Sequence, residues 1–127
     1  MTTLRRGWPT AVGRDEIAAA ISTVPGIDGV GLPPSVPAPG MGWPVWATRA
    51  PVNDCLAEVT YYVYVTLPAG QGAPLASDAI VWDVEAALMG LGTLVATDPV
   101  ALATGTGGES IPAIRCTVKV ESERPQS

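Results

Sequence analysis

Alternation of apolar and polar side chains marks residues 57–67 as a β-strand, because successive side chains of a strand point to opposite faces of a sheet. The apolar face comprises Ala57, Val59, Tyr61, Val63, Val65 and Leu67. The other face is mixed and comprises Glu58, Thr60, Tyr62, Tyr64 and Thr66. We therefore expect a strand over about 56–67 with one face in the core and the other against water or a partner.

The hydrophobic period changes to that of a helix in residues 74–91, after the turn at 67–72. One continuous stripe consists of Ile80, Val84, Ala87, Leu88 and Leu91. Trp82, Glu85 and Met89 lie off this stripe, and glycines at 90 and 92 end the helix. An earlier helix is predicted over 14–23, with acidic residues in its first turn and Pro25-Gly26 after it.

The remaining segments predict shorter strands and long loops. Residues 26–53 contain six prolines and five glycines and predict a long loop. Within it, Trp43, Val45 and Ala47 are expected on one face of a short edge strand, with Trp46 on the other. A strand is expected at 94–96, with an interruption at Asp98-Pro99 and a continuation at 100–102. Residues 103–109 are expected to form a loop, and residues 112–121 the last strand.

Together these elements predict an α+β fold, in which a small, mostly antiparallel or mixed sheet packs against two helices and carries long Pro/Gly-rich loops. Residues 1–13 are expected to be an N-terminal arm, 14–121 a single domain, and 122–127 a polar C-terminal tail. The 127-residue length fits one domain.

The net charge of −5, from seven basic and twelve acidic residues, argues against nucleic-acid binding through many phosphate contacts. An acidic surface instead repels DNA, which suits a conduit through which DNA slides and also suits many ordinary proteins. No stretch approaches the 18 apolar residues of a membrane span, and the N-terminus carries no secretory signal, so we expect an intracellular protein without a membrane partner.

Few residues here are suited to catalysis. Histidine is absent, and Cys55 and Cys116 are expected to be reduced, although both lie at or in predicted strands and could approach each other. Asp78, Asp83 and Glu85 share a helix without a convergent partner, so a solvated face is expected. The glycine-rich 105–108 segment lacks the Lys-Ser/Thr of a phosphate loop. We therefore expect that the protein is not an enzyme and that it has no catalytic, cofactor-binding or metal-binding residues.

Aromatic residues are the remaining candidates for function. Five of them are predicted to contact a neighbouring subunit, because Trp and Tyr are enriched where proteins meet: Trp43, Trp46, Tyr62, Tyr64 and Trp82. Filling of gaps in the core is the alternative interpretation for the tryptophans, and the sequence leaves it open.

The order and lengths of these segments over about residues 14–121 resemble the tail terminator (tail completion) proteins of long-tailed phages that infect actinobacteria. The resemblance is carried by the 14–23 helix, Gly42-Trp43-Pro44-Val45-Trp46, Val63-Tyr64-Val65-Thr66-Leu67-Pro68, Ala76-Ser77-Asp78, and Ile111-Pro112-Ala113-Ile114-Arg115-Cys116-Thr117-Val118. A composition rich in Ala, Gly and Pro also fits a GC-rich genome.

The resemblance implies a structural virion protein, assembled in the bacterial cytoplasm, that forms a hexameric ring at the tail–neck junction. The ring caps the tail tube and joins it to the head-side connector, so its expected partners are copies of itself, the tube protein and the connector, with DNA only as passing cargo. The alternatives are another neck or tube component, such as a head–tail stopper or tube subunit, or a small intracellular ligand-binding module.

Overall fold

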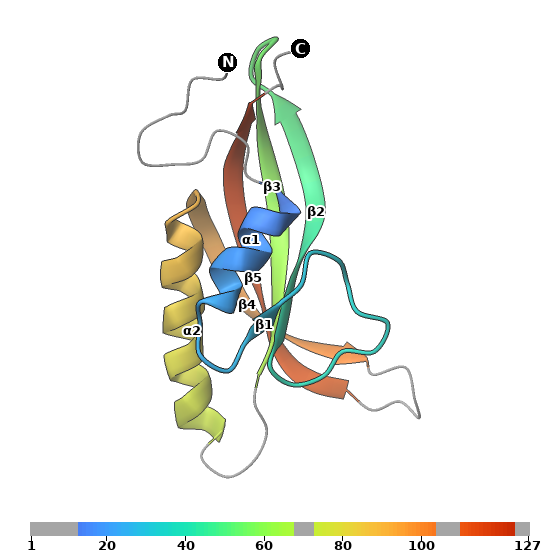
Figure 1. Ribbon diagram of the computed structural model, residues 1–127, viewed down its shortest axis with the longest axis vertical. Helices are drawn as coiled ribbons and strands as arrows, with labels where there is room; N and C mark the ends of the chain where they lie inside the picture. Colours follow the sequence, from blue (N-terminus) through green and yellow to red (C-terminus); the bar gives the residue numbers. More distant parts are fainter. Residues whose placement is uncertain (1–12, 68–72, 104–109, 124–127) are drawn as a thin grey trace.

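The computed structural model describes residues 13–67, 73–103 and 110–123, and Figure 1 shows their arrangement. The elements in chain order are α1 (Arg14–Ser22), β1 (Asp28–Gly29), β2 (Met41–Pro51), β3 (Leu56–Thr66), α2 (Ala73–Met89), β4 (Thr93–Ala103) and β5 (Ser110–Glu123). The predicted arm, most of the 103–109 loop and most of the C-terminal tail lie outside the described residues.

The strands form one mixed sheet in the order β1-β2-β3-β5-β4. All neighbouring pairs are antiparallel except β1 and β2, which run parallel. Both helices cover the same face of this sheet, and β2, β3 and β5 extend past them (Figure 1). The predicted α+β class, with a mostly antiparallel sheet packed against two helices, is confirmed.

The core lies between the helices and the central strands β3 and β5. Val59 pairs with Val120, and the pairing continues through Val63 and Cys116 to Val65 and Ile114. The predicted apolar side chains of β3 from Ala57 to Val65 are all buried, as are their apolar partners on β5. The period-two pattern therefore assigned the faces of both strands correctly.

The helices also bury the predicted positions. The Glu16 carboxylate accepts a hydrogen bond of 2.7 Å from the Gly13 N–H, which satisfies a free amide at the start of α1. Ile17 and Ile21 of α1 are fully buried, as are Val84 and Leu88 of α2. These four side chains fix how both helices rest on the sheet.

The prediction of a long loop over 26–53 holds for residues 30–40 but was wrong for residues 28–29 and for the length of the edge strand, because 28–29 and 41–51 are strands. The expected short edge strand is the eleven-residue β2. Its proline is compatible with this position, since β1 pairs only with Met41 and Gly42 and leaves Pro44 on an open edge. Trp43 and Trp46 do face opposite sides of the sheet, because their partners Tyr64 and Tyr61 do.

The interruption predicted at Asp98-Pro99 was also wrong. β4 runs continuously from Thr93 to Ala103, with a register shift between Leu94 and Ala96. β4 is the outermost of the described strands, and proline is tolerated there because one side of the strand has no neighbour among them. β5 is longer than the predicted 112–121 and covers Ser110–Glu123.

Thr66 differs most from its predicted place on the mixed face, because its side chain is fully buried. Its hydroxyl donates a hydrogen bond to the Ala38 carbonyl and accepts one of 2.8 Å from the Met41 N–H. The segment before β2 thus closes over the end of β3. A small hydroxyl side chain is favoured here because it forms hydrogen bonds with two backbone groups at a partly buried position.

Replacing Thr66 with valine, which has nearly the same shape, should lower the free energy of unfolding by about 1–3 kcal/mol, because two backbone groups lose their partner. Urea denaturation measures this change. The control is Thr60→Val on the same face of β3, where no side-chain hydrogen bond occurs within the described residues, and about 0.5 kcal/mol or less is expected. Equal effects of the two substitutions would contradict the role of the Thr66 hydroxyl.

Candidate subunit interface

The five predicted aromatic residues occupy three separate surfaces. Trp43, Tyr62 and Tyr64 lie on the sheet face that the helices leave open. Trp46 is on the opposite face with Tyr61, and Trp82 is on the outer side of α2. They do not form one patch, and whether any of them contacts another subunit stays a prediction.

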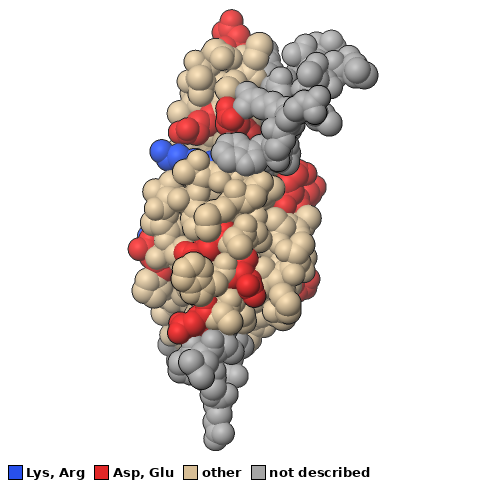
Figure 2. All heavy atoms as spheres, turned by 90° about the vertical axis from the view of Figure 1, so that its left-hand side faces the viewer, with Lys and Arg blue, Asp and Glu red and all other residues tan. Residues whose placement is uncertain are grey.

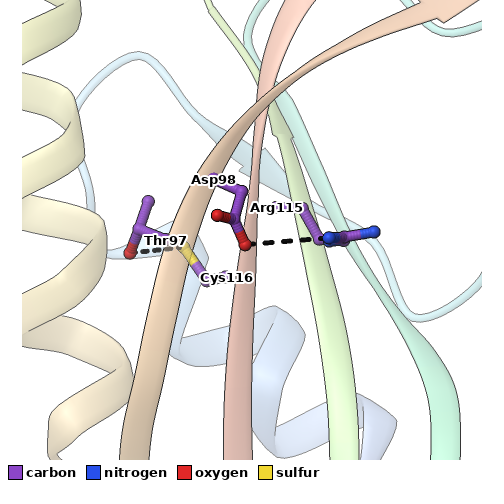
Figure 3. Close-up of polar contacts among 4 residues, drawn as sticks. All are labelled: Thr97, Asp98, Arg115 and Cys116. Atoms are coloured by element: carbon purple, nitrogen blue, oxygen red, sulfur yellow. Dashed lines mark hydrogen bonds and ion pairs between the residues drawn. The ribbon is translucent and has the colours of Figure 1, made fainter.

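On the open face of the sheet, the aromatic rings are largely used within the chain. Trp43 is only 5% exposed, and its ring stacks on Tyr64 with centroids 6.0 Å apart. The Arg115 guanidinium lies 4.9 Å from the Tyr62 ring centroid and 3.7 Å from the Asp98 carboxylate (Figure 3). This cross-strand network of stacking, cation–π and ionic contacts binds β2, β3, β5 and β4 together.

The outer side of α2 presents the most exposed of these side chains. Trp82 is 72% exposed and Met89 is 49% exposed. At 3.6 residues per turn, Asp78, Trp82 and Met89 share one side of the helix, and Asp83 borders it. Figure 2, which views α2 from outside, shows carboxylates and uncharged residues over this side, and the sequence of α2 contains no Lys or Arg. This apolar, acidic surface is the outer α2 face.

Trp46 lines a cleft of about 290 Å³ on the helix-covered side of the sheet. Its other lining residues are Arg14, Arg49, Val59, Tyr61 and Ser122. Trp46 is 55% exposed, and Arg14 Nη1 donates a hydrogen bond of 3.1 Å to the Pro44 carbonyl of β2. We call this surface the arginine cleft.

Sequence reasoning missed this cleft because a β-bulge builds it. Trp46 pairs with Tyr61 and Thr48 pairs with Thr60, so Ala47 is an extra residue on β2. The shift turns Arg49, rather than Thr48, to the same side as Trp46. Without the bulge, alternation would place Arg49 on the open face, and no turn residue or periodicity in the segment signals the change.

The three carboxylates of α2 do not form a catalytic or metal-binding cluster. Asp78 and Asp83 are exposed on α2, and Glu85 accepts a hydrogen bond of 2.7 Å from the Thr97 hydroxyl. Within the described ranges, no group of three or more His, Cys, Asp or Glu residues could hold a metal ion. The part of the chain that the structure describes also has no helix long and apolar enough to span a membrane.

Both cysteines are free, with Cys55 exposed in the β2–β3 turn and Cys116 buried in the core. Burial raises the pKa of the Cys116 thiol to about 11, while the Thr97 hydroxyl, 3.7 Å from its sulfur, partly opposes this shift (Figure 3). A thiol with a raised pKa is a weak nucleophile. Cys116 therefore acts as a core side chain.

Comparison with known protein families, curated proteins and solved structures found no match to this chain.

The raised pKa predicts how stability depends on alkaline pH. The unfolded thiol ionises near 9.0 and the folded one near 11, so the unfolded state loses its proton first and the native state becomes less stable between these values. At about 1.4 kcal/mol per pH unit, this difference of two units corresponds to about 2–3 kcal/mol. Urea denaturation from pH 8 to 11 measures it.

The matched control is Cys116→Ala, which removes this titration but keeps every other alkaline group. It will be less stable at pH 8 because it leaves a cavity, and its free energy of unfolding should decline less steeply with pH. Parallel declines in the two proteins would show that the buried thiol is not the cause.

Proposed function

We propose that this protein is a structural subunit of a phage virion, namely a tail terminator whose hexameric ring caps the tail tube and joins it to the head-side connector. The specific function in this proposal comes from the resemblance of its segments to the tail terminator family. The observation that carries a self-assembling role is the exposed Trp82 on the outer α2 face, because large aromatic side chains are characteristic anchors of protein interfaces.

The chemistry of the surface fits assembly better than catalysis. The described carboxylates do not form a cluster that could hold a metal ion. Of the two cysteines, Cys116 is buried, and Cys55 is exposed and follows Asp54 in the sequence. The chain is acidic overall, with a net charge of −5. Such a ring would not retain DNA that passes through its channel, since tight binding to phosphates requires many basic contacts.

A small ligand-binding module is the second candidate, and the arginine cleft is the observation that favours it. Two guanidinium groups beside Trp46 could take a small carboxylate or phosphate ligand. The cleft volume of about 290 Å³ falls just below the roughly 300–1,000 Å³ of typical small-molecule sites, so the fit is marginal. A head–tail stopper or a tube subunit would use similar exposed surfaces.

Purified protein should form a six-fold ring with a central channel, alone or at the end of isolated tail tubes, as seen by native mass spectrometry and electron microscopy. A tube subunit would instead lengthen the tubes, and a stopper would bind the connector but not the tube end. A monomer that never occupies tube ends would contradict the proposal. Control tubes already capped by their own terminator should bind none of the added protein.

A further inference from the structure

Two of the described basic side chains lack an acidic partner, and both are in the arginine cleft. The described ranges contain four Lys or Arg residues. Arg115 lies 3.7 Å from Asp98 and Lys119 lies 3.8 Å from Glu58. Arg14 and Arg49 have no carboxylate partner within these ranges. Within the described ranges, the two guanidinium groups without a carboxylate partner thus lie around one cleft.

The floor of this cleft is suited to an aromatic side chain. Tyr61 and Val59 come from the buried face of β3, and Trp46 stands beside them, 55% exposed. The site therefore combines an apolar base with two cations at its rim. A complementary surface would have an aromatic or apolar centre with negative charge on either side.

The outer α2 face has this composition. Trp82 is its most exposed side chain, at 72%. Helical spacing of 100° per residue places Asp78 about 40° to one side of Trp82 and Asp83 about 100° to the other. The face therefore offers one indole flanked by two carboxylates, with no basic residue anywhere on the helix.

We infer that the arginine cleft of one subunit receives the outer α2 face of a second copy of the same chain. Trp82 enters the cleft beside Trp46, and Asp78 and Asp83 of the entering helix pair with Arg14 and Arg49. The two surfaces are different parts of the subunit, so the contact is head-to-tail. An open chain of subunits therefore keeps one free surface of each kind, at its two ends, until a ring closes. This assignment rests on the proposal that the chain assembles with itself.

Charge complementarity selects this occupant over others. The first twelve residues contain Arg5 and Arg6 and no Asp or Glu, so they would add positive charge to a cleft that is already basic. A small ligand would leave Trp82 exposed and α2 unpartnered. A second copy instead neutralises both surfaces and covers two exposed tryptophans at once.

Single substitutions test each side of the contact by sedimentation velocity. Arg49→Asp should weaken self-association about tenfold or more through charge repulsion, and Trp82→Ala about 30-fold through loss of the anchor. The matched controls are Lys119→Ala, which removes a cation from the open sheet face, and Val95→Ala, which removes an exposed apolar side chain from β4. Both controls should associate like the natural protein. Circular dichroism and thermal unfolding establish that each variant is folded.

Mixing variants distinguishes this contact from a merely structural effect. Arg49→Asp keeps a working α2 face, and Trp82→Ala keeps a working cleft. At a concentration where the natural protein associates, each variant alone should be mainly monomeric. Their equimolar mixture should form a dimer that grows no further, because only one complementary pair of surfaces remains. The double variant Arg49→Asp with Asp83→Arg should recover association, since it restores opposite charges across the contact.

The inference is overturned if the single variants associate as well as the controls, or if their mixture stays monomeric. It is also overturned if Arg49→Asp lowers the stability of the monomer without changing self-association, which is the result expected for a cleft filled by residues of its own chain. It is also overturned if the natural protein is monomeric and the variants occupy tube ends equally well. The proposed function can fail separately. In that case the mixture dimerises as expected, but the natural oligomer does not occupy tube ends.

Discussion

The register between β3 and β5 is the constraint on which the other features depend. Eleven consecutive residue pairs join these strands without a shift, from Leu56 with Glu123 to Thr66 with Ala113. A slip of one residue would turn every side chain of a strand to the opposite face. The register therefore decides at once that Val63 and Cys116 enter the core and that Tyr64 and Arg115 lie on the open face.

The sequence predicted those parts of the fold in which local pattern and burial agree. β3 alternates without exception up to Val65, and α2 buries the Val84 and Leu88 stripe, so both elements could be identified from period alone. β4 and β2 were misjudged because proline was interpreted as an interruption. Each proline sits on a strand edge, and edge position is a property of the whole sheet that no local window contains.

The candidate interface was predictable only in its residue types. The exposure of Trp82 follows from its position off the buried helical stripe, and this is visible in the sequence. The burial of Trp43 is not, because it depends on stacking across two strands. The arginine cleft could not be predicted from local pattern, since it needs a bulge at Ala47 to turn Arg49 and a separate helix, α1, to supply Arg14.

The bulge also explains why the two proposed contact surfaces can be so unlike. An assembly that uses the same patch on both subunits must be complementary to itself, and a helix face whose only charged side chains are acidic would repel its copy. A head-to-tail contact requires a basic counterpart elsewhere on the same chain. Two of the four described cations are already paired with carboxylates, and the shift at Ala47 turns Arg49 toward the cleft that Arg14 also lines. In the proposed contact, one extra residue in one strand therefore gives an acidic subunit a basic cleft that complements its acidic helix face.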